Sequence, residues 1–235
     1  MNDQFINQLR DVCGEAVLTD PLELLTYECD GLPHLRHAPP AVVLPSSAEQ
    51  VREVVRLCHR HGVPFVARGH GSGLSGGALP IPGGLVIGLA RLNRVLDVDI
   101  PNRRVTVEPG VTNLEITRQV APYGFYYAPD PSSQQVCSIG GNVAENSGGA
   151  HCLKYGFTVH HVLGVEAVTP DGDIVQVGSE GTLGVVVEVV LRILRRPEAT
   201  RTFFATFPST DEAGNAVSLI IAAGTMPAAM ISDTA

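Results

Sequence analysis

Residues 67–82, ARGHGSGLSGGALPIP, limit the fold more than any other stretch of the chain. Gly71 to Gly76 match the pattern G-x-G-x-x-G, which in nicotinamide-binding proteins ends a strand and begins a helix whose N-terminus faces the pyrophosphate. Pro80 and Pro82 follow, and a proline removes a backbone donor and clashes with a preceding helical turn. We therefore expect no long helix after these glycines and no tight binding of NAD or NADP.

The same loop suits an anion in a second way. Glycine accepts positive φ and lets the backbone approach a ligand, so that several N–H groups converge on it as a nest. Ser72 and Ser75 add hydroxyl groups, and Arg68 adds a positive charge. Taken alone, the loop leaves a ligand-free surface loop open as the alternative.

Two further segments are rich in small residues. They are APDPSSQQVCSIGGNVAENSGG at 128–149 and GSEGTLG at 178–184. Three such segments spread along one chain favour a single long, flat ligand that is wrapped by backbone and carries a diphosphate in its middle.

Local patterns predict an α+β fold of two lobes. Strands at 41–45 and 63–68 enclose a helix with capping-box spacing at Ser46 and Glu49, which forms a β-α-β unit with parallel strands. A third strand follows at 83–90, and Thr112 begins a helix to about Val120. The remaining segments predict a larger, mostly antiparallel lobe, with strands at 94–100, 103–110, 162–170, 173–177 and 184–194. Beyond it we expect a strand at 202–207 and a helix capped by Ser209.

Composition excludes several classes of protein. The net charge of −8 argues against nucleic acid as a partner. The first residues carry no apolar signal core, and no run approaches the roughly 18 apolar residues of a membrane span. Five cysteines without a C-x-x-C pair suit a reducing compartment. We therefore expect a cytoplasmic protein with no membrane span.

Five segments carry a resemblance to a known family. They are TYECDG (26–31), RGHGSGLSGGALP (68–80), VEPGVTNL (107–114), YYAPDPSSQQVCSIGGNVAENSGGAHCLKYG (126–156) and GSEGTLGV (178–185). Together they resemble the FAD-binding domain of the vanillyl-alcohol-oxidase type, also called the PCMH type. FAD-linked 2-hydroxyacid dehydrogenases, such as the FAD subunit of glycolate oxidase, contain this domain.

The resemblance implies a cofactor, a reaction and a set of binding residues. The cofactor is FAD, and the reaction is oxidation of a 2-hydroxy acid resembling glycolate or D-lactate by hydride transfer to flavin N5. The implied cofactor-binding residues are Arg68, Gly69, Gly71, Ser72, Gly73, Leu74, Pro129, Asp130, Ser133, Gly140, Gly141, Asn142, Ser147, Gly148, Gly149 and Glu180. Some flavoproteins of this fold attach FAD to a loop histidine, but that position corresponds to Ser72 and not to His70. We therefore expect non-covalent FAD.

The chain departs from the family pattern in two ways. A stretch that the family has between the positions of Val177 and Gly178 is absent, and the family continues into a cap and a histidine-containing C-terminal segment. We therefore expect an FAD-binding domain over 1–200, with lobes at about 20–93 and 94–200, and the start of a truncated substrate-binding cap over 201–235. Companion FAD and iron–sulfur subunits are implied partners, and no catalytic residue is assigned.

Two other readings of the whole chain stay open. One is a non-catalytic remnant that binds flavin weakly or binds only a partner. The other is a flavin-dependent reductase of cell-wall precursors, which the APDPSSQ motif disfavours.

Histidine and cysteine patterns favour structural roles. The pairs His34/His37, His59/His61 and His160/His161 lack a third metal ligand at useful spacing, so we expect no metal site. Cys137 and Cys152 fall within the flavin-lining motif, where a small apolar filler is the favoured interpretation over a redox thiol.

Overall fold

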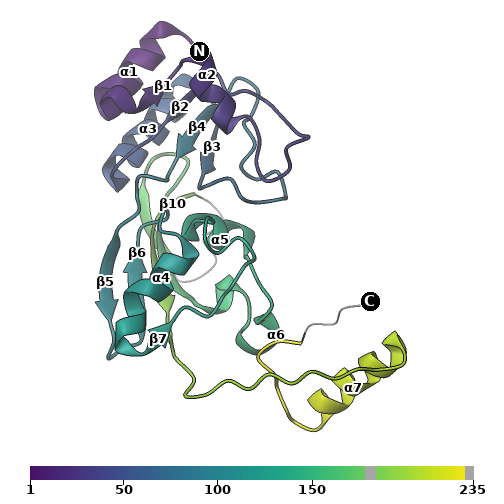
Figure 1. The fold of residues 1–235 in the computed structure, drawn as a ribbon. Helices are drawn as coiled ribbons and strands as arrows, with labels where there is room; N and C mark the ends of the chain where they lie inside the picture. The colour runs from purple at the N-terminus through teal and green to yellow at the C-terminus, as the bar shows by residue number, and fades with distance from the viewer. Residues whose placement is uncertain (178–183, 231–235) are drawn as a thin grey trace.

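The computed structural model describes residues 1–177 and 184–230. Figure 1 shows two lobes, one above the other, with the last helix standing away from both. The first lobe is built on a four-stranded sheet of order β1-β2-β4-β3. Its strands are β1 (Val17–Leu18), β2 (Ala41–Val43), β3 (Phe65–Arg68) and β4 (Leu85–Gly88). β1 is antiparallel to β2, and β4 is parallel to both β2 and β3.

Side chains along the strands of the first lobe alternate between the two faces of the sheet and so belong to two apolar layers. Ala41 and Val43 of β2 face one core with α1 (Asp3–Cys13) and α3 (Ala48–His61), whereas Val42 faces a second core with Leu24. Leu24 ends the short helix α2 (Pro21–Leu24), which precedes the 3₁₀ turn η2 (Leu25–Tyr27). A second 3₁₀ turn, η1 (Gly14–Ala16), follows α1. Because successive strand side chains point to opposite faces, the sheet is covered on both sides.

Two expectations for this lobe are corrected in detail. Ser47, not Ser46, is the N-cap of α3, and its hydroxyl accepts the Gln50 N–H at 3.2 Å. Gln50 Oε1 accepts the Ser46 N–H in return, so the capping pair is shifted by one residue from the predicted pair. β2 and β3 run parallel as expected, but β4 lies between them and pairs with each.

The second lobe is built on a five-stranded antiparallel sheet of order β5-β6-β10-β8-β9. Its strands are β5 (Val95–Asp99), β6 (Arg104–Val107), β8 (Val162–Val168), β9 (Ile174–Val177) and β10 (Val185–Arg192). A two-stranded ribbon pairs β7 (Phe125–Tyr126) with β11 (Leu194–Arg195). The helical elements are α4 (Asn113–Val120), η3 (Ala121–Tyr123), α5 (Ile139–Glu145), α6 (Cys152–Tyr155) and η4 (Thr158–His160). The expected helix from Thr112 is confirmed, although the Thr112 side chain makes no capping hydrogen bond.

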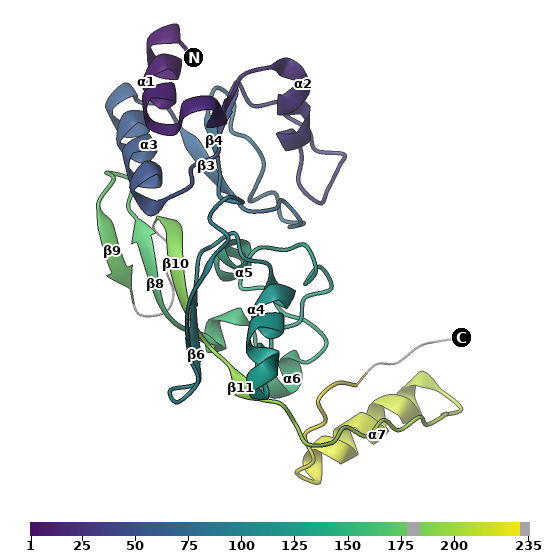
Figure 2. The same cartoon turned by 60° about the vertical axis from the view of Figure 1, so that its left-hand side comes forward.

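The two lobes are joined by packing as well as by the chain. Val168 of β8 and Val185 and Val187 of β10 belong to the apolar core that lies under α3. At the β8–β9 turn, the Arg56 side chain of α3 contacts Gly172 and forms an ion pair with Asp173 at 3.6 Å. Figure 2 shows this turn beside α3.

The last described helix stands away from both lobes, as Figures 1 and 2 show. Helix α7 (Thr210–Ala222) is capped by Ser209, whose hydroxyl accepts the Glu212 N–H at 3.2 Å, as expected. The strand predicted at 202–207 is wrong, because this stretch has no neighbouring strand within the described residues. Phe203 and Phe204 are 87% and 91% exposed. None of the helices in the described ranges is long and apolar enough to cross a membrane.

A buried histidine makes the second lobe sensitive to acid. His161 is 3% exposed and shares its core with Tyr127, and its Nε2 contacts the Tyr155 carbonyl oxygen at 2.8 Å. Burial is the main cause that lowers the pKa of His161. The unfolded chain therefore binds this proton more readily, and stability should fall as pH decreases below about 6.5, the pKa of an unperturbed histidine.

We expect His161→Gln to flatten this part of the pH dependence of unfolding, because glutamine cannot be protonated in this range. Urea unfolding of both chains on either side of neutral pH measures the effect. His59→Gln, which changes an exposed histidine, is the control. If the free energy of unfolding of His161→Gln depends on pH as steeply as that of the unmodified chain, His161 is not the cause of the acid sensitivity.

Candidate functional site

The glycine-rich loop at residues 69–78 directly follows β3 and contains a run of backbone donors without partners in the described chain. Within the described residues, none of the backbone N–H groups of residues 69–75 donates to another group of the chain. Gly71 has a φ of +70°, a conformation that favours glycine. The first helix after the loop is α4, so the loop does not begin a Rossmann helix. A run of unpaired donors of this kind is suited to an anion.

Arg68 lies beneath the loop rather than beyond it. Arg68 is 7% exposed, and its guanidinium donates to the Ala78 carbonyl at 3.1 Å. A Cβ on Gly71 would lie 2.2 Å from Arg68 Nη2, so the guanidinium fills the space under that residue. Ser72 and Gly73 follow, and Leu74 is 66% exposed at the tip. The direct contact of Arg68 with a diphosphate stays a prediction.

The second glycine-rich segment meets the loop at two points. A Cβ on Gly69 would lie 2.0 Å from Ser138 Oγ, so the two backbones approach where no side chain fits. The Ser75 hydroxyl donates to Glu145, the last residue of α5, at 2.5 Å. Ser138 is the N-cap of α5, and Gly140, Gly141 and Asn142 lie in this helix. Sequence reasoning assigned no role to Ser138 or Glu145.

The remaining predicted residues form a neighbouring group on the second lobe. The Asn113 amide donates to the Pro129 carbonyl at 3.1 Å. The Asp130 carboxylate accepts from the ring and the backbone N–H of His151, and Gly149 packs against Asp130. Gly148 contacts Phe157, and the Ser147 carbonyl accepts from both the backbone and the hydroxyl of Thr158. Ser133 lies in the preceding turn, and its carbonyl accepts the Val136 and Cys137 N–H groups. Glu180 lies outside the described residues.

Asn142 supplies a test of whether FAD fits. Its side chain belongs to a 2% exposed residue, and its Nδ2 has no hydrogen-bond partner among the described residues. An unpaired buried amide donor is costly, by about 1–3 kcal/mol. The carbonyl oxygens and ring nitrogens of a flavin are acceptors that would remove this cost. The unpaired N–H groups of the loop match a diphosphate in the same way, so the residues present fit FAD.

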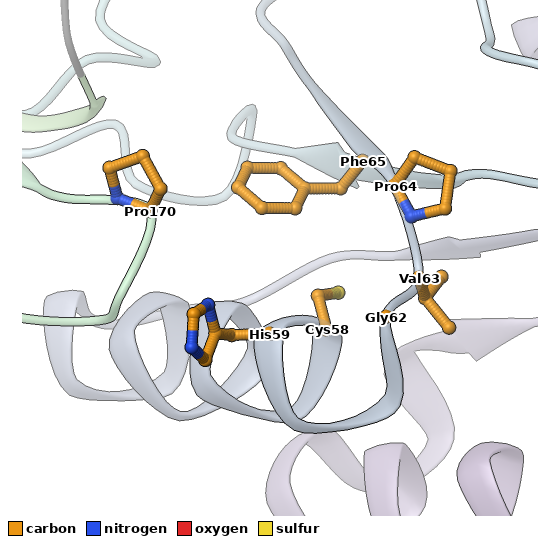
Figure 3. A pocket seen from close by; sticks show the side chains of 7 residues that line it. All are labelled: Cys58, His59, Gly62, Val63, Pro64, Phe65 and Pro170. Carbon is orange, nitrogen blue, oxygen red and sulfur yellow. The ribbon is translucent and has the colours of Figure 1, made fainter.

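A separate hollow lies at the opposite end of β3. It has a volume of about 430 Å³ and is lined by Cys58, His59, Gly62, Val63, Pro64, Phe65 and Pro170. Figure 3 shows Pro170 and Phe65 facing each other above His59. Because the loop follows the carboxyl end of β3 and this hollow borders its amino end, the hollow is not part of the candidate site.

A family profile that matches most of the two lobes identifies the family of this chain. Residues 39–178 match the sequence profile of the family described as FAD binding domain. The chain belongs to this family. The fold class of this FAD-binding domain, α+β with a mostly antiparallel larger sheet, is thereby confirmed along with FAD as its cofactor.

Named relatives of this FAD-binding domain are FAD-linked oxidoreductases. It is 48% identical over 233 residues to the glycolate oxidase subunit GlcD of Escherichia coli strain K12, covering 92% of this chain and 47% of that protein. The corresponding protein of Bacillus subtilis is 39% identical over 224 residues, with 88% and 48% covered. More distant relatives at 35% and 32% identity are named D-2-hydroxyglutarate dehydrogenase, from Xanthomonas citri, and D-lactate dehydrogenase, from Anaerostipes hadrus.

Solved structures confirm the PCMH-type fold. An alkyldihydroxyacetonephosphate synthase superposes with a TM-score of 0.85 and 26% identity over 97% of this chain and 48% of that chain. p-Cresol methylhydroxylase superposes with a TM-score of 0.74 and 21% identity over 84% of this chain and 44% of that chain. The chain therefore spans about half the length of the proteins that it matches.

The alignments also support an internal deletion. The alignment with the Escherichia coli protein runs over 233 residues but uses 92% of 235, about 216, so about 17 aligned positions have no counterpart in this chain. For the Bacillus subtilis protein, 88% of 235 is about 207 of 224 aligned residues, which again leaves about 17. The placement of this deletion between Val177 and Gly178 stays a prediction.

Proposed function

We propose that the chain is the FAD-binding part of an FAD-linked oxidoreductase that oxidises a 2-hydroxy acid of the glycolate or D-lactate kind. The observation that carries the proposal is the row of unpaired N–H groups at residues 69–75, and the buried, unpaired Asn142 amide supports it. The names of the relatives, which include glycolate oxidase subunit and D-lactate dehydrogenase, support this substrate class.

The protein's own contribution to this function is binding and orientation. The loop N–H groups would hold the diphosphate, with the Arg68 guanidinium supplying positive charge from below. The second segment, from Pro129 to Gly149, would line the isoalloxazine side and exclude water there. FAD, held non-covalently, would supply the chemistry by accepting the hydride from Cα of the 2-hydroxy acid at N5.

The rest of the assembly is part of the same proposal. Residues 1–200 form the FAD-binding domain, divided near residue 93, and residues 201–235 begin a substrate-binding cap. Helix α7 has exposed apolar side chains such as Leu219, at 70%, which suits a segment that packs on further protein. Companion FAD and iron–sulfur subunits would receive the electrons. Five free cysteines favour placement in the cytoplasm.

A non-catalytic flavin-binding chain is the second candidate. It is favoured by the aligned positions that have no counterpart in this chain.

Both candidates need FAD, so the first experiment measures FAD binding. We expect the purified chain to quench flavin fluorescence on titration with FAD and to show the visible absorption bands of bound flavin. Calorimetry with NAD and NADP is the control and should show no specific binding, since no helix begins at the glycine loop. Failure to bind FAD would contradict the proposal.

A further inference from the structure

A short segment of the first lobe, residues 27–31, packs behind the glycine loop. It precedes the region matched by the family profile, which begins at residue 39. Its central residue is Asp30, which is 7% exposed. Asp30 Oδ1 accepts the Leu32 N–H at 2.8 Å, and Asp30 Oδ2 accepts the Gly76 N–H at 2.9 Å. One carboxylate therefore ties the loop to a segment 46 residues away.

Gly31 adds a second tie. Its N–H donates to the Gly73 carbonyl at 2.9 Å. A Cβ at residue 31 would lie 2.7 Å from the Gly73 carbonyl oxygen and 3.0 Å from that of Ser72. The loop backbone thus rests directly on residue 31, at a distance that only glycine permits.

Arg68 completes the arrangement from below. Its guanidinium carbon lies 5.7 Å from the centroid of the Tyr27 ring. Burial is the main cause that lowers the pKa of Arg68, and Cys29, Tyr27 and Asp30 oppose it electrostatically. A buried charge is tolerated when it has a partner of opposite sign. Asp30 is the carboxylate among these groups, and we call Asp30, Gly31 and Arg68 the rear clamp.

We propose that Asp30 and Gly31 are positioning residues that fix the glycine loop from behind in its FAD-binding form. The inference rests on FAD as the cofactor and is independent of the substrate. A glycine-rich loop loses much conformational entropy on ordering, and a loop that is already ordered binds more tightly. The Asp30 carboxylate takes the Gly76 N–H and leaves those of residues 69–75 for the ligand.

Because Asp30 is negatively charged, the direction in which Asp30→Asn changes FAD affinity tests this proposal. A carboxylate beside a diphosphate site repels the ligand, so neutralising it would strengthen FAD binding if charge were its only effect. If Asp30 positions the loop, Asp30→Asn weakens FAD binding instead, because the amide cannot accept at both oxygens. We expect the FAD Kd to rise by about tenfold, the size of one lost hydrogen bond to a charged group.

Two variants separate positioning from general stability. Asp20→Asn is the matched control, because Asp20 accepts the Leu22 N–H at 2.8 Å in the same local geometry but has no tie to the loop. Gly31→Ala keeps the charge and pushes on the loop through its Cβ. We expect Gly31→Ala to weaken FAD binding as Asp30→Asn does, and Asp20→Asn to leave the FAD Kd unchanged.

The measurements are FAD titration of each folded variant well below its melting temperature and, without FAD, amide hydrogen exchange at residues 31 and 76, whose N–H groups form the two ties. Faster exchange at residue 31 in Asp30→Asn and at Gly76 in Gly31→Ala supports the clamp, because each variant then loosens the tie that it does not itself alter. An FAD Kd for Asp30→Asn equal to or tighter than that of the unmodified chain overturns it, as does unchanged exchange at these two residues. If the unmodified chain binds no FAD, the cofactor assignment fails, and the exchange measurement still decides whether the clamp orders the loop.

Discussion

Replacing Gly73 by valine is expected to abolish FAD retention while leaving the fold intact. Nothing in the described chain lies within 4 Å of a Cβ built at Gly73, and its φ is not positive. The side chain therefore costs the FAD-free protein little, and it occupies space on a loop whose neighbouring N–H groups are unpaired. We expect FAD affinity to fall by at least about 100-fold, or about 2.7 kcal/mol. Flavin fluorescence titration and thermal unfolding measure the two effects separately.

Valine substitutions at two other glycines show whether the loss of FAD affinity is specific to Gly73. Gly71→Val should lower stability and FAD affinity together, because φ is +70° and the Arg68 guanidinium occupies the place of the side chain. Gly214→Val in α7 also meets nothing within 4 Å and should leave FAD binding unchanged. If Gly73→Val keeps FAD at the level of the unmodified chain, the diphosphate lies elsewhere.

A polypeptide of residues 1–235 is expected not to oxidise glycolate, D-lactate or D-2-hydroxyglutarate at an enzymatic rate, even with added FAD. The reaction needs the substrate carboxylate held and its hydroxyl proton taken by a positioned base. The chain spans 47% of the Escherichia coli relative and lacks about 17 positions of the aligned region. Dye reduction with each acid, against a flavin-only control, should give turnover below about 1 per second, the low end for ordinary enzymes.

A chimaera tests the reason for the missing activity. Inserting the relative's missing positions and fusing the rest of its chain after residue 235 should restore dye reduction. Adding either part alone distinguishes the effect of the internal positions from that of the relative's C-terminal half. Turnover above about 1 per second by residues 1–235 would place the base within this chain, and His151, which contacts Asp130, would be the first residue to replace.

Local sequence patterns predicted most strands of the two sheets and the helices α3 and α4, but not α1, α2, α5 or α6. The helix between the strands at 41–45 and 63–68, the helix from Thr112 and the lack of a helix after the glycine loop each depend on neighbouring residues, and each is observed. The prediction at 202–207 was wrong because an apolar, β-prone segment becomes a strand only when another strand pairs with it. The capping pair of α3 was displaced because two adjacent serines, Ser46 and Ser47, offer the same chemistry.

By itself, the sequence determined most strands of the two sheets and the glycine-rich loop after β3, and through its motifs it determined the family and the cofactor. Only the tertiary structure decided which segments meet. It inserted β4 between β2 and β3, brought Ser75 to Glu145 across 70 residues, and placed the Asp30 carboxylate under the loop. Local propensity depends on a residue's neighbours along the chain, whereas these contacts depend on the path of the backbone between distant segments. The glycine-rich loop was therefore predictable from the sequence, whereas the residues that hold it in place were not.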